Sequence, residues 1–554
     1  MKKILLILIV FHISLVTVSA QPSWTKKASK SVFTLKTFAD DGSLIASSNG
    51  FFVGSQGEAV SSFSPFKGAV RAIVIDTSGK ELEVTGMMGA NEMYDVAKFR
   101  GAGKTQPLVV AQSVVQEGAT VWLLPYRDTK NIGSGLIRKA EQFQNDYAYY
   151  TVALQMPEQA ICCPLLNDAG EVVGMMQPSA SSDDSLSYAI SARYADSLKV
   201  TGLSLNSPTL QMTRIRTELP DNLQDANLML FMAGSSADSA SYVRLIDDFI
   251  KKFPTAPDGY TYRAQSACSY GDFSSAERDM EEAIKLSDPK DNAHFNYARL
   301  IYNKEIYQSQ LPYTGWSLDK ALTEIREAIS ANPLPAYRQL EGNILFAQNK
   351  YDEAYNVFIP LTKTNLDEAE MWFAAARCKE MLKDTTSMIA LLDSTIATFS
   401  KPYLKQAAPY IWARANARMD VGRYREAVSD MNDYEQLMGT ELNARFYYIR
   451  HQAEIEGHLY QQALNDIGRA ITMEPREPLY YAEKASLEIR VGRYDDAIAT
   501  ARECIAVDAN GSDGYLFLGL AQCLKGNKAE GIANLQKAKE LGDPQADTLI
   551  EKYK

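Results

Sequence analysis

The chain has 554 residues, of which 46% are hydrophobic and 23% are charged. This composition is typical of globular protein and excludes a chain that is disordered throughout. The formal net charge of −11 argues against a nucleic-acid-binding function, and the length predicts several domains.

The first 20 residues have the pattern of a signal peptide. Residues 2–3 are lysines, residues 4–18 form an apolar run, and residues 18–20 (VSA) resemble a signal-peptidase site. We therefore expect cleavage before Gln21 and export to the periplasm, with full secretion as the alternative. No later apolar run reaches the ~20 residues that cross a bilayer, so we expect no transmembrane segment in the mature chain.

Residues 21–205 predict an all-β domain. Short runs rich in Val, Ile, Tyr and Phe alternate with Gly, Asp, Asn and Ser, which is the pattern of a sandwich or barrel. Residues 206–221 contain Pro208 and Pro220 and no long periodic stretch, which favours a linker.

Four segments of the β region resemble, in the same order, the HtrA-like branch of the trypsin-like serine proteases. They are SNGFFVGSQGEAVSSFSPFKGA (48–69), YDVAKFR (94–100), QAICCPLLNDAGEVVGMM (159–176) and LSYAISARY (186–194). The resemblance implies a trypsin-like double β-barrel. In its frame, the family's catalytic histidine falls on Ser64 and its serine on Ile161, whereas the aspartate is kept as Asp95.

The resemblance therefore implies a degenerate triad. A serine nucleophile needs a neighbouring base, and an isoleucine side chain carries no nucleophilic atom. The glycine of the family's oxyanion hole is replaced by Gln159, and the two glycines that follow the nucleophile are replaced by Cys162 and Cys163. The chain's histidines, none of which lies in residues 21–205, are His12, His294, His451 and His458. We predict a pseudo-protease with no catalytic residues, and not an enzyme.

From residue 222 the hydrophobic pattern becomes helical and repeats itself. Four similar segments, VGRYREAVSDM, LYQQALNDI, VGRYDDAIATA and KGNKAEGIANL, align at Tyr424, Tyr460, Tyr494 and Lys528, with spacings of 36, 34 and 34 residues. They resemble the tetratricopeptide repeat, a helix–turn–helix unit of 34 residues. The resemblance implies an all-α solenoid of about nine repeats in residues 222–542, followed by a cap helix in residues 543–554.

A repeat solenoid of this kind has a groove lined by the first helix of each repeat, where peptides or partner proteins bind. The register places aromatic, amide and charged side chains on that face. The candidate partner-binding residues are Trp412, Asn416, Asp420, Arg445, Tyr448, Gln452, Ser486 and Arg490. An extended peptide in the protease-like cleft is a second expected mode of binding.

The six cysteines show no zinc-site spacing, and we expect neither a metal nor a cofactor. The sequence thus predicts an exported scaffold that binds proteins through its repeats. One alternative is a serine-type peptidase whose missing catalytic groups are displaced or come from elsewhere, such as His294 or a partner chain. A cysteine protease with Cys162 or Cys163 as nucleophile is disfavoured, because the β domain contains no histidine to lower the pKa of a thiol. A second alternative is a structural subunit of an envelope complex.

Overall fold

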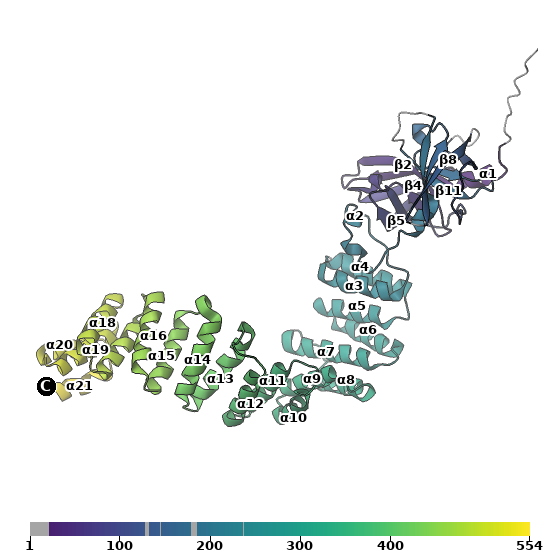
Figure 1. The fold of residues 1–554 in the computed structure, drawn as a ribbon. Coiled ribbons are helices and arrows are strands. Elements are labelled where there is room, and N and C mark those ends of the chain that lie inside the picture. Colours follow the sequence, from purple (N-terminus) through teal and green to yellow (C-terminus); the bar gives the residue numbers. More distant parts are fainter. Residues whose placement is uncertain (1–20, 128–131, 145, 179–184, 237) are drawn as a thin grey trace, which may run out of the picture. The chain divides into compact units, whose positions relative to one another are not determined.

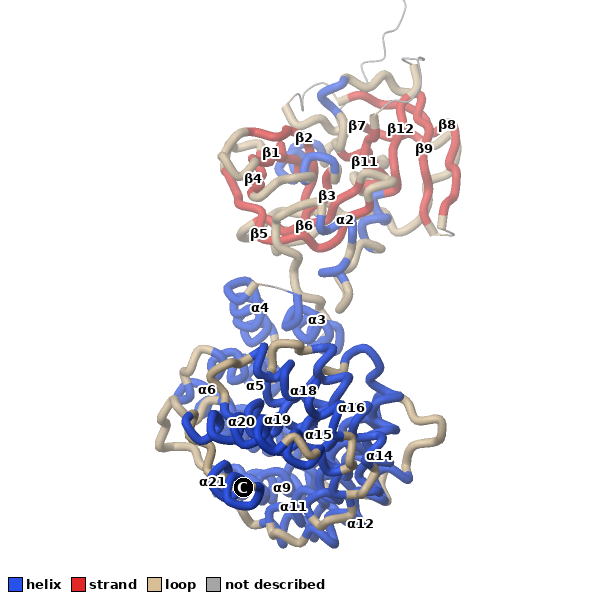
Figure 2. Tube along the Cα trace, turned by 90° about the vertical axis from the view of Figure 1, so that its left-hand side faces the viewer, coloured by secondary structure: helices blue, strands red, loops and turns tan. Residues whose placement is uncertain are grey.

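The computed structural model describes residues 21–127, 132–144, 146–178, 185–236 and 238–554. The predicted signal peptide, residues 1–20, lies outside the described residues. The chain divides into two compact units, Met1–Ser266 and Ala267–Lys554. The strands of the described chain all belong to the first unit, and the second unit is helical (Figures 1 and 2).

The first β-barrel is antiparallel and closes in the order β1-β2-β3-β6-β5-β4. Its interior is aromatic, because Phe33 lies with its ring centroid 4.7 Å from Phe52 and 6.1 Å from Phe99. The strands are β1 (Val32–Phe38), β2 (Leu44–Phe52), β3 (Glu58–Ser61), β4 (Arg71–Asp76), β5 (Glu81–Asn91) and β6 (Val96–Gly101).

The second barrel closes in the order β10-β11-β12-β9-β8-β7. The hairpin of β10 and β11 turns at residues 167–170, where Gly170 has a φ of +82° that favours glycine. The strands are β7 (Thr120–Leu123), β8 (Gly133–Phe143), β9 (Tyr147–Ala153), β10 (Pro164–Leu166), β11 (Val172–Gln177) and β12 (Ser187–Ser191).

A hydrophobic cluster joins the two barrels. Phe51 and Val60 of the first barrel pack in the same buried cluster as Leu166, Met175 and Ile190 of the second. This shared core fixes the barrels against each other, so the loops that face the junction have defined positions.

The segment predicted as a linker, residues 206–221, lies along the first barrel. Helix α2 (Pro208–Gln211) places Leu210 in the core of that barrel, and Ile215 is buried in the same cluster. Beyond it, the amide of Met87 donates to the carbonyl of Arg216 at 2.8 Å, and the amide of Glu218 donates to the carbonyl of Met87 at 2.9 Å. The segment is therefore packed and hydrogen-bonded.

Helices follow in succession after this segment, and within the second unit, from α6 to α21, helices that are neighbours in sequence pack together. The first unit contains α1 (Thr25–Ala28), α3 (Leu223–Ser236) and α4 (Ser239–Lys252), and the division falls within α5 (Pro257–Ser269). The second unit contains α6 (Phe273–Leu286), α7 (Asp291–Tyr307), α8 (Leu318–Ala331), α9 (Pro335–Ala347), α10 (Tyr351–Leu361), α11 (Glu368–Met381), α12 (Thr385–Ala397), α13 (Ala408–Asp420), α14 (Tyr424–Met438), α15 (Ala444–Glu456), α16 (Tyr460–Met473), α17 (Pro478–Arg490), α18 (Tyr494–Val507), α19 (Ser512–Lys525), α20 (Lys528–Glu540) and α21 (Ala546–Tyr553).

In seven helix pairs of the described chain, the turn from the first to the second helix contains a residue in the left-handed backbone conformation. Glycine suits this conformation because it has no Cβ. Glycines fill the position in four turns, but Asn349, Lys383 and His458 adopt it with φ of +62°, +59° and +59°. The four glycines are Gly271, Gly422, Gly492 and Gly526.

The first helix of a repeat packs closely against the second helix of the same repeat where small buried residues lie between them. A Cβ on Gly342 would lie 2.7 Å from the Phe358 ring, which shows how closely α9 and α10 pack. In α15 the corresponding residue is His451, which is fully buried and has its Nδ1 2.9 Å from the Ala463 carbonyl of α16.

The predicted architecture, an all-β double barrel followed by an all-α solenoid, is confirmed. Among the residues that the structure describes, no helix combines the length and apolar composition needed to cross a lipid bilayer.

Candidate functional site

The first two predicted triad positions lie together in the first barrel. Ser64 begins a short 3-10 helix (Ser64–Phe66), and Asp95 precedes β6. Asp95 Oδ1 accepts two hydrogen bonds from Ser64, one from the amide at 2.6 Å and one from the hydroxyl at 2.8 Å. Asp95 has a φ of +49°, which aspartate tolerates better than most residues.

The third position, Ile161, follows the 3-10 helix Glu158–Ala160 in the second barrel. Its amide donates to the carbonyl of Glu158 at 3.4 Å, within the same turn. From the first barrel, the side-chain amide of Asn49 donates to the carbonyls of Gln159 at 2.7 Å and of Ile161 at 3.1 Å. The loop is therefore held with two of its carbonyls directed toward Asn49 and with the Ile161 amide hydrogen-bonded to the Glu158 carbonyl.

Cys162 and Cys163 complete this loop as buried free thiols. Burial raises the pKa of the Cys162 thiol, although the hydroxyls of Ser62 and Ser48 hydrogen-bond to it. Burial also raises the pKa of Cys163, to about 12. A thiol needs a lowered pKa to act as a nucleophile near neutral pH, so both environments keep the protonated, unreactive form.

In the helical unit, the structure joins two of the predicted groove residues directly. Gln452 Nε2 donates to the hydroxyl of Tyr448 at 2.9 Å, and that hydroxyl donates to Glu483 of α17 at 3.4 Å. Gln452 is exposed and Tyr448 is half-buried. This network links the first helices α15 and α17 on a face that solvent reaches.

Trp412 and Arg445 line a pocket of about 340 Å³ between α13, α14 and α15. Trp412 is also a packing residue, because its ring centroid lies 5.0 Å from that of Tyr434 and 5.9 Å from that of Phe446.

The remaining groove candidates are not joined to this pocket or to the Tyr448 network. Arg490 is exposed and lies over the Tyr460 ring. Within the described part of the chain, Asn416, Asp420 and Ser486 make no side-chain hydrogen bond in this structure.

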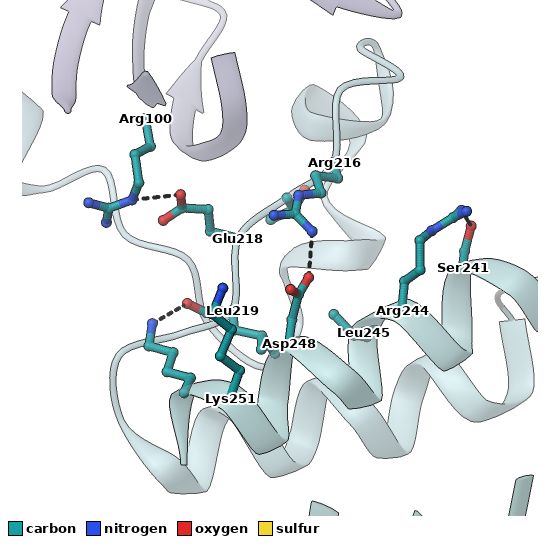
Figure 3. Close-up of a pocket in the computed structure, with 11 residues that line it drawn as sticks. Arg100, Arg216, Glu218, Leu219, Ser241, Arg244, Leu245, Asp248 and Lys251 are labelled. Atoms are coloured by element: carbon teal, nitrogen blue, oxygen red, sulfur yellow. Dashed lines mark hydrogen bonds and ion pairs between the residues drawn. The ribbon is translucent and has the colours of Figure 1, made fainter. Parts of the chain in front are cut away.

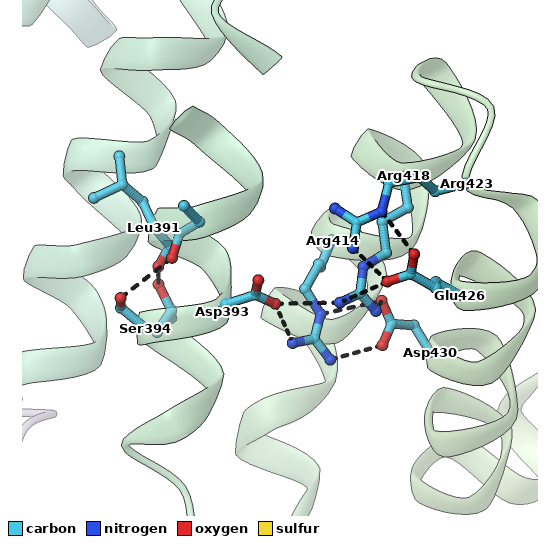
Figure 4. Close-up of polar contacts among 10 residues, drawn as sticks. Leu391, Asp393, Ser394, Arg414, Arg418, Arg423, Glu426 and Asp430 are labelled. Carbon is cyan, nitrogen blue, oxygen red and sulfur yellow. Dashed lines mark hydrogen bonds and ion pairs between the residues drawn. The ribbon is translucent and has the colours of Figure 1, made fainter. Parts of the chain in front are cut away.

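Sequence reasoning missed two buried ion networks. Asp430 accepts a bidentate pair from Arg414 at 3.1 and 2.7 Å and a further bond from Arg418 at 2.7 Å (Figure 4). One repeat later, Arg450 pairs with Asp466 at 2.6 and 3.1 Å. The arginines and the aspartates each recur after 36 residues, and this spacing was the available signal.

A pocket of about 460 Å³ in the first unit was also missed (Figure 3). It is lined by Arg100 of β6, the segment 216–219 and helix α4. Arg100 pairs with Glu218 and with Glu58, each at 2.7 Å, and Arg216 pairs with Asp248. These pairs neutralise much of the pocket's positive charge. Among the described residues, no group of three or more His, Cys, Asp or Glu side chains could hold a metal ion.

Comparisons with known proteins match part of the helical unit. Residues 482–546 match the family model of the tetratricopeptide repeat. The helical unit contains tetratricopeptide repeats. Small glutamine-rich tetratricopeptide repeat-containing protein 2 from Mycosarcoma maydis is 30% identical over 90 residues, which is 16% of this chain and 25% of the relative. The protein of the same name from Saccharomyces cerevisiae is 28% identical over 95 residues, 17% of this chain and 28% of the relative.

Protein SGT1 homolog from Bos taurus is 28% identical over 87 residues, which is 16% of this chain and 26% of the relative. The chain thus spans about a quarter of the length of these relatives. Among solved structures, the active form of the Rv3671c protease from M. tuberculosis matches with a TM-score of 0.29 and 19% identity. That match covers 36% of this chain and 86% of the protease chain.

Proposed function

We propose that this protein is an exported scaffold that binds partner proteins or peptides through its tetratricopeptide repeats, and that its β-barrel domain is a trypsin-like domain without catalytic activity. The observation that carries the binding role is the network of Gln452, Tyr448 and Glu483, because it joins an exposed amide to a half-buried aromatic hydroxyl and a half-buried carboxylate on the first helices α15 and α17. Such mixed polar and aromatic surfaces are common at protein interfaces.

The lack of catalysis is supported by the contact between Ser64 and Asp95. A carboxylate alone is too weak a base to activate a hydroxyl, which is why the family interposes a histidine. Residues 21–205 contain no histidine, and Ile161 offers only hydrocarbon. The amide of Ile161 is bonded to Glu158, so it is not free to stabilise an oxyanion in this arrangement.

A peptidase that uses a substitute thiol is disfavoured by the buried, protonated state of Cys162 and Cys163. The cleft between the barrels remains a proposed second site for an extended peptide, held without being cut. The periplasm is the proposed location, on the strength of the leader pattern in residues 1–20.

The binding role can be tested by pull-down from native envelope extract with the mature chain, residues 21–554. The double variant Tyr448→Ala, Gln452→Ala should lose the captured partner, because both changes remove groups from the proposed surface. The matched control Arg502→Ala changes an exposed residue of the second helix α18 and should capture it normally. Equal capture by all three proteins would contradict the proposed surface, and capture by none would favour a purely structural subunit.

A further inference from the structure

A pocket that is more enclosed than the one at Trp412 lies on the first helices of the preceding repeats. Helices α7, α9, α10 and α11 line it, and its volume is about 470 Å³. We call it the anchor pocket. Its walls combine aromatic and apolar side chains with the polar side chains of Asn343, Asn349 and Arg377. The aromatic and apolar contributors are Tyr302, Tyr307, Phe346, Tyr351, Ile306 and Met381.

The anchor pocket exposes apolar surface that nothing in the second unit covers. Ile306 is 40% exposed, Met381 is 47% exposed and Tyr307 is 73% exposed. At the same time, Phe346 and Tyr302 are half-buried, and burial raises the pKa of Tyr302. A hollow with half-buried aromatic walls, exposed apolar side chains at its mouth and a few polar groups can receive a large apolar side chain.

The one charged side chain that lines the pocket indicates which class of ligand it can bind. Arg377 is the single charged residue among those that line it, and no carboxylate lines it. The guanidinium of Arg377 lies 4.9 Å from the Phe346 ring centroid and has no ion-pair partner among the described residues. By contrast, Arg414 and Arg450, on later first helices, are each satisfied by two carboxylates.

This contrast matters in a chain with 68 acidic and 57 basic residues. An exposed arginine that keeps no acidic partner in such a chain is available for an acid from elsewhere. The planar guanidinium, held over an aromatic ring, can pair with a carboxylate through two parallel hydrogen bonds.

Asn343 adds a third element to the pocket. It lies 34 residues before Arg377, so the two side chains occupy the same position in successive repeats. Asn343 makes no side-chain hydrogen bond within the described chain. An asparagine amide can both donate to and accept from a peptide bond, which suits it to hold the main chain of an extended ligand.

We propose that the anchor pocket binds an extended peptide segment of a partner protein, in which a large apolar side chain enters the pocket and an adjacent carboxylate pairs with Arg377. The inference rests on the proposed function and names the ligand class of the repeats. Burial of one large apolar side chain supplies the affinity, and the pairing with Arg377 supplies the selectivity for an acidic neighbour.

The test uses the mature chain and a display library of random peptides. Selected sequences should share Phe, Tyr, Trp or Leu within two positions of Asp or Glu. Synthetic fluorescent copies then give affinities by polarisation. Replacing the acidic residue by its amide should weaken binding about tenfold, and Arg377→Glu should weaken the parent peptide by a similar factor.

A charge reversal separates pairing from structural damage. Peptides with Lys in place of the acidic residue should bind Arg377→Glu better than they bind the wild type. Arg502→Glu, an equal change of charge on α18, should leave all affinities unchanged, and both variants should unfold at the wild-type temperature.

Three results would overturn the inference: no selected peptides, selected peptides without the apolar and acidic pair, or unchanged affinity in Arg377→Glu. If such peptides lose affinity in Tyr448→Ala, Gln452→Ala and keep it in Arg377→Glu, the anchor pocket is wrong while the proposed function stands. If neither variant changes the affinity, the anchor pocket and the proposed binding function of the repeats are both wrong.

Discussion

Ser64 donates two hydrogen bonds to one carboxylate oxygen of Asp95, from its amide at 2.6 Å and from its hydroxyl at 2.8 Å. The resemblance to HtrA-like proteases aligns these residues with the catalytic histidine and aspartate. The two positions thus meet as a catalytic pair would, although the residue that would act as base is a serine.

The first prediction concerns restoring the nucleophile. Ile161→Ser should not hydrolyse casein or fluorogenic peptides, because a hydroxyl at this position has no base and the local amide is bonded to Glu158. Labelling by a fluorophosphonate probe should also fail. Clear labelling of this variant, with none of the wild type, would show that the loop can rearrange into an active form.

The second prediction concerns the ion network of α13 and α14. Asp430→Asn should destabilise the helical unit by about 3–5 kcal/mol, because it leaves Arg414 and Arg418 buried with reduced compensation. Asp393→Asn removes a half-exposed partner of the same arginines and should cost less than about 1 kcal/mol. Urea unfolding followed by circular dichroism measures both, and equal losses would contradict the assignment of Asp430 as the central anion.

The third prediction concerns pH. Burial, with Asp466 nearby, raises the pKa of Glu454 to about 8. Between the unfolded pKa near 4.5 and about 8, the folded state therefore holds more protons, and the stability falls as pH rises. Glu454→Gln should remove this loss, so its stability advantage over the wild type should grow from less than about 1 kcal/mol at pH 5 to about 4 kcal/mol near pH 8.

His451 changes the stability in the opposite direction. Burial lowers its pKa from 6.5, so the unfolded state binds the proton first and stability falls as pH drops below about 6.5. His451→Gln should therefore reduce the acid sensitivity of the helical unit without changing its behaviour at pH 8. Thermal unfolding across this pH range distinguishes the two residues, and parallel curves for both variants would contradict their opposite roles.

The fourth prediction concerns the left-handed turn residues. Lys383→Gly should stabilise the protein by about 0.5–1 kcal/mol, because a left-handed residue with a Cβ costs about 1–2 kcal/mol and glycine loses part of that gain through its unfolded-state entropy. The reverse change, Gly492→Lys, should destabilise by about 1 kcal/mol. A loss of stability in Lys383→Gly would mean that the lysine side chain makes a stabilising contact.

The architecture could be predicted from the sequence because two periodic patterns specify it. The alternation of apolar and polar residues in strands and the 34-residue repeat are local patterns, and the barrels and helices of the structure match them. The sequence also brought Ser64 and Asp95 together, since family anchors fix their frame. It did not predict the packing of residues 206–221, because the bonds of Arg216 and Glu218 to Met87 join positions more than a hundred residues apart.

The buried arginines show a second limit of sequence reasoning. Arg414 and Arg450 lie on first helices, as the exposed candidate residues do, and their charge alone predicts that they face solvent. Their burial depends on aspartates of the following helix, which become neighbours only in the folded repeat. Trp412 departs from its prediction in the opposite direction. The sequence predicts a groove residue that faces solvent, whereas in the structure Trp412 lines a pocket and also packs against Tyr434.

The most direct test of the account places a photo-crosslinking amino acid at position 452 of the mature chain in its native envelope, with position 502 on α18 as control, and measures the mass of the crosslinked partner. The account predicts an adduct at position 452 that contains the partner at full length, and no such adduct at position 502. A partner cleaved during its encounter with the purified protein, or equal crosslinking from both positions, would contradict a non-catalytic scaffold that binds through its repeats.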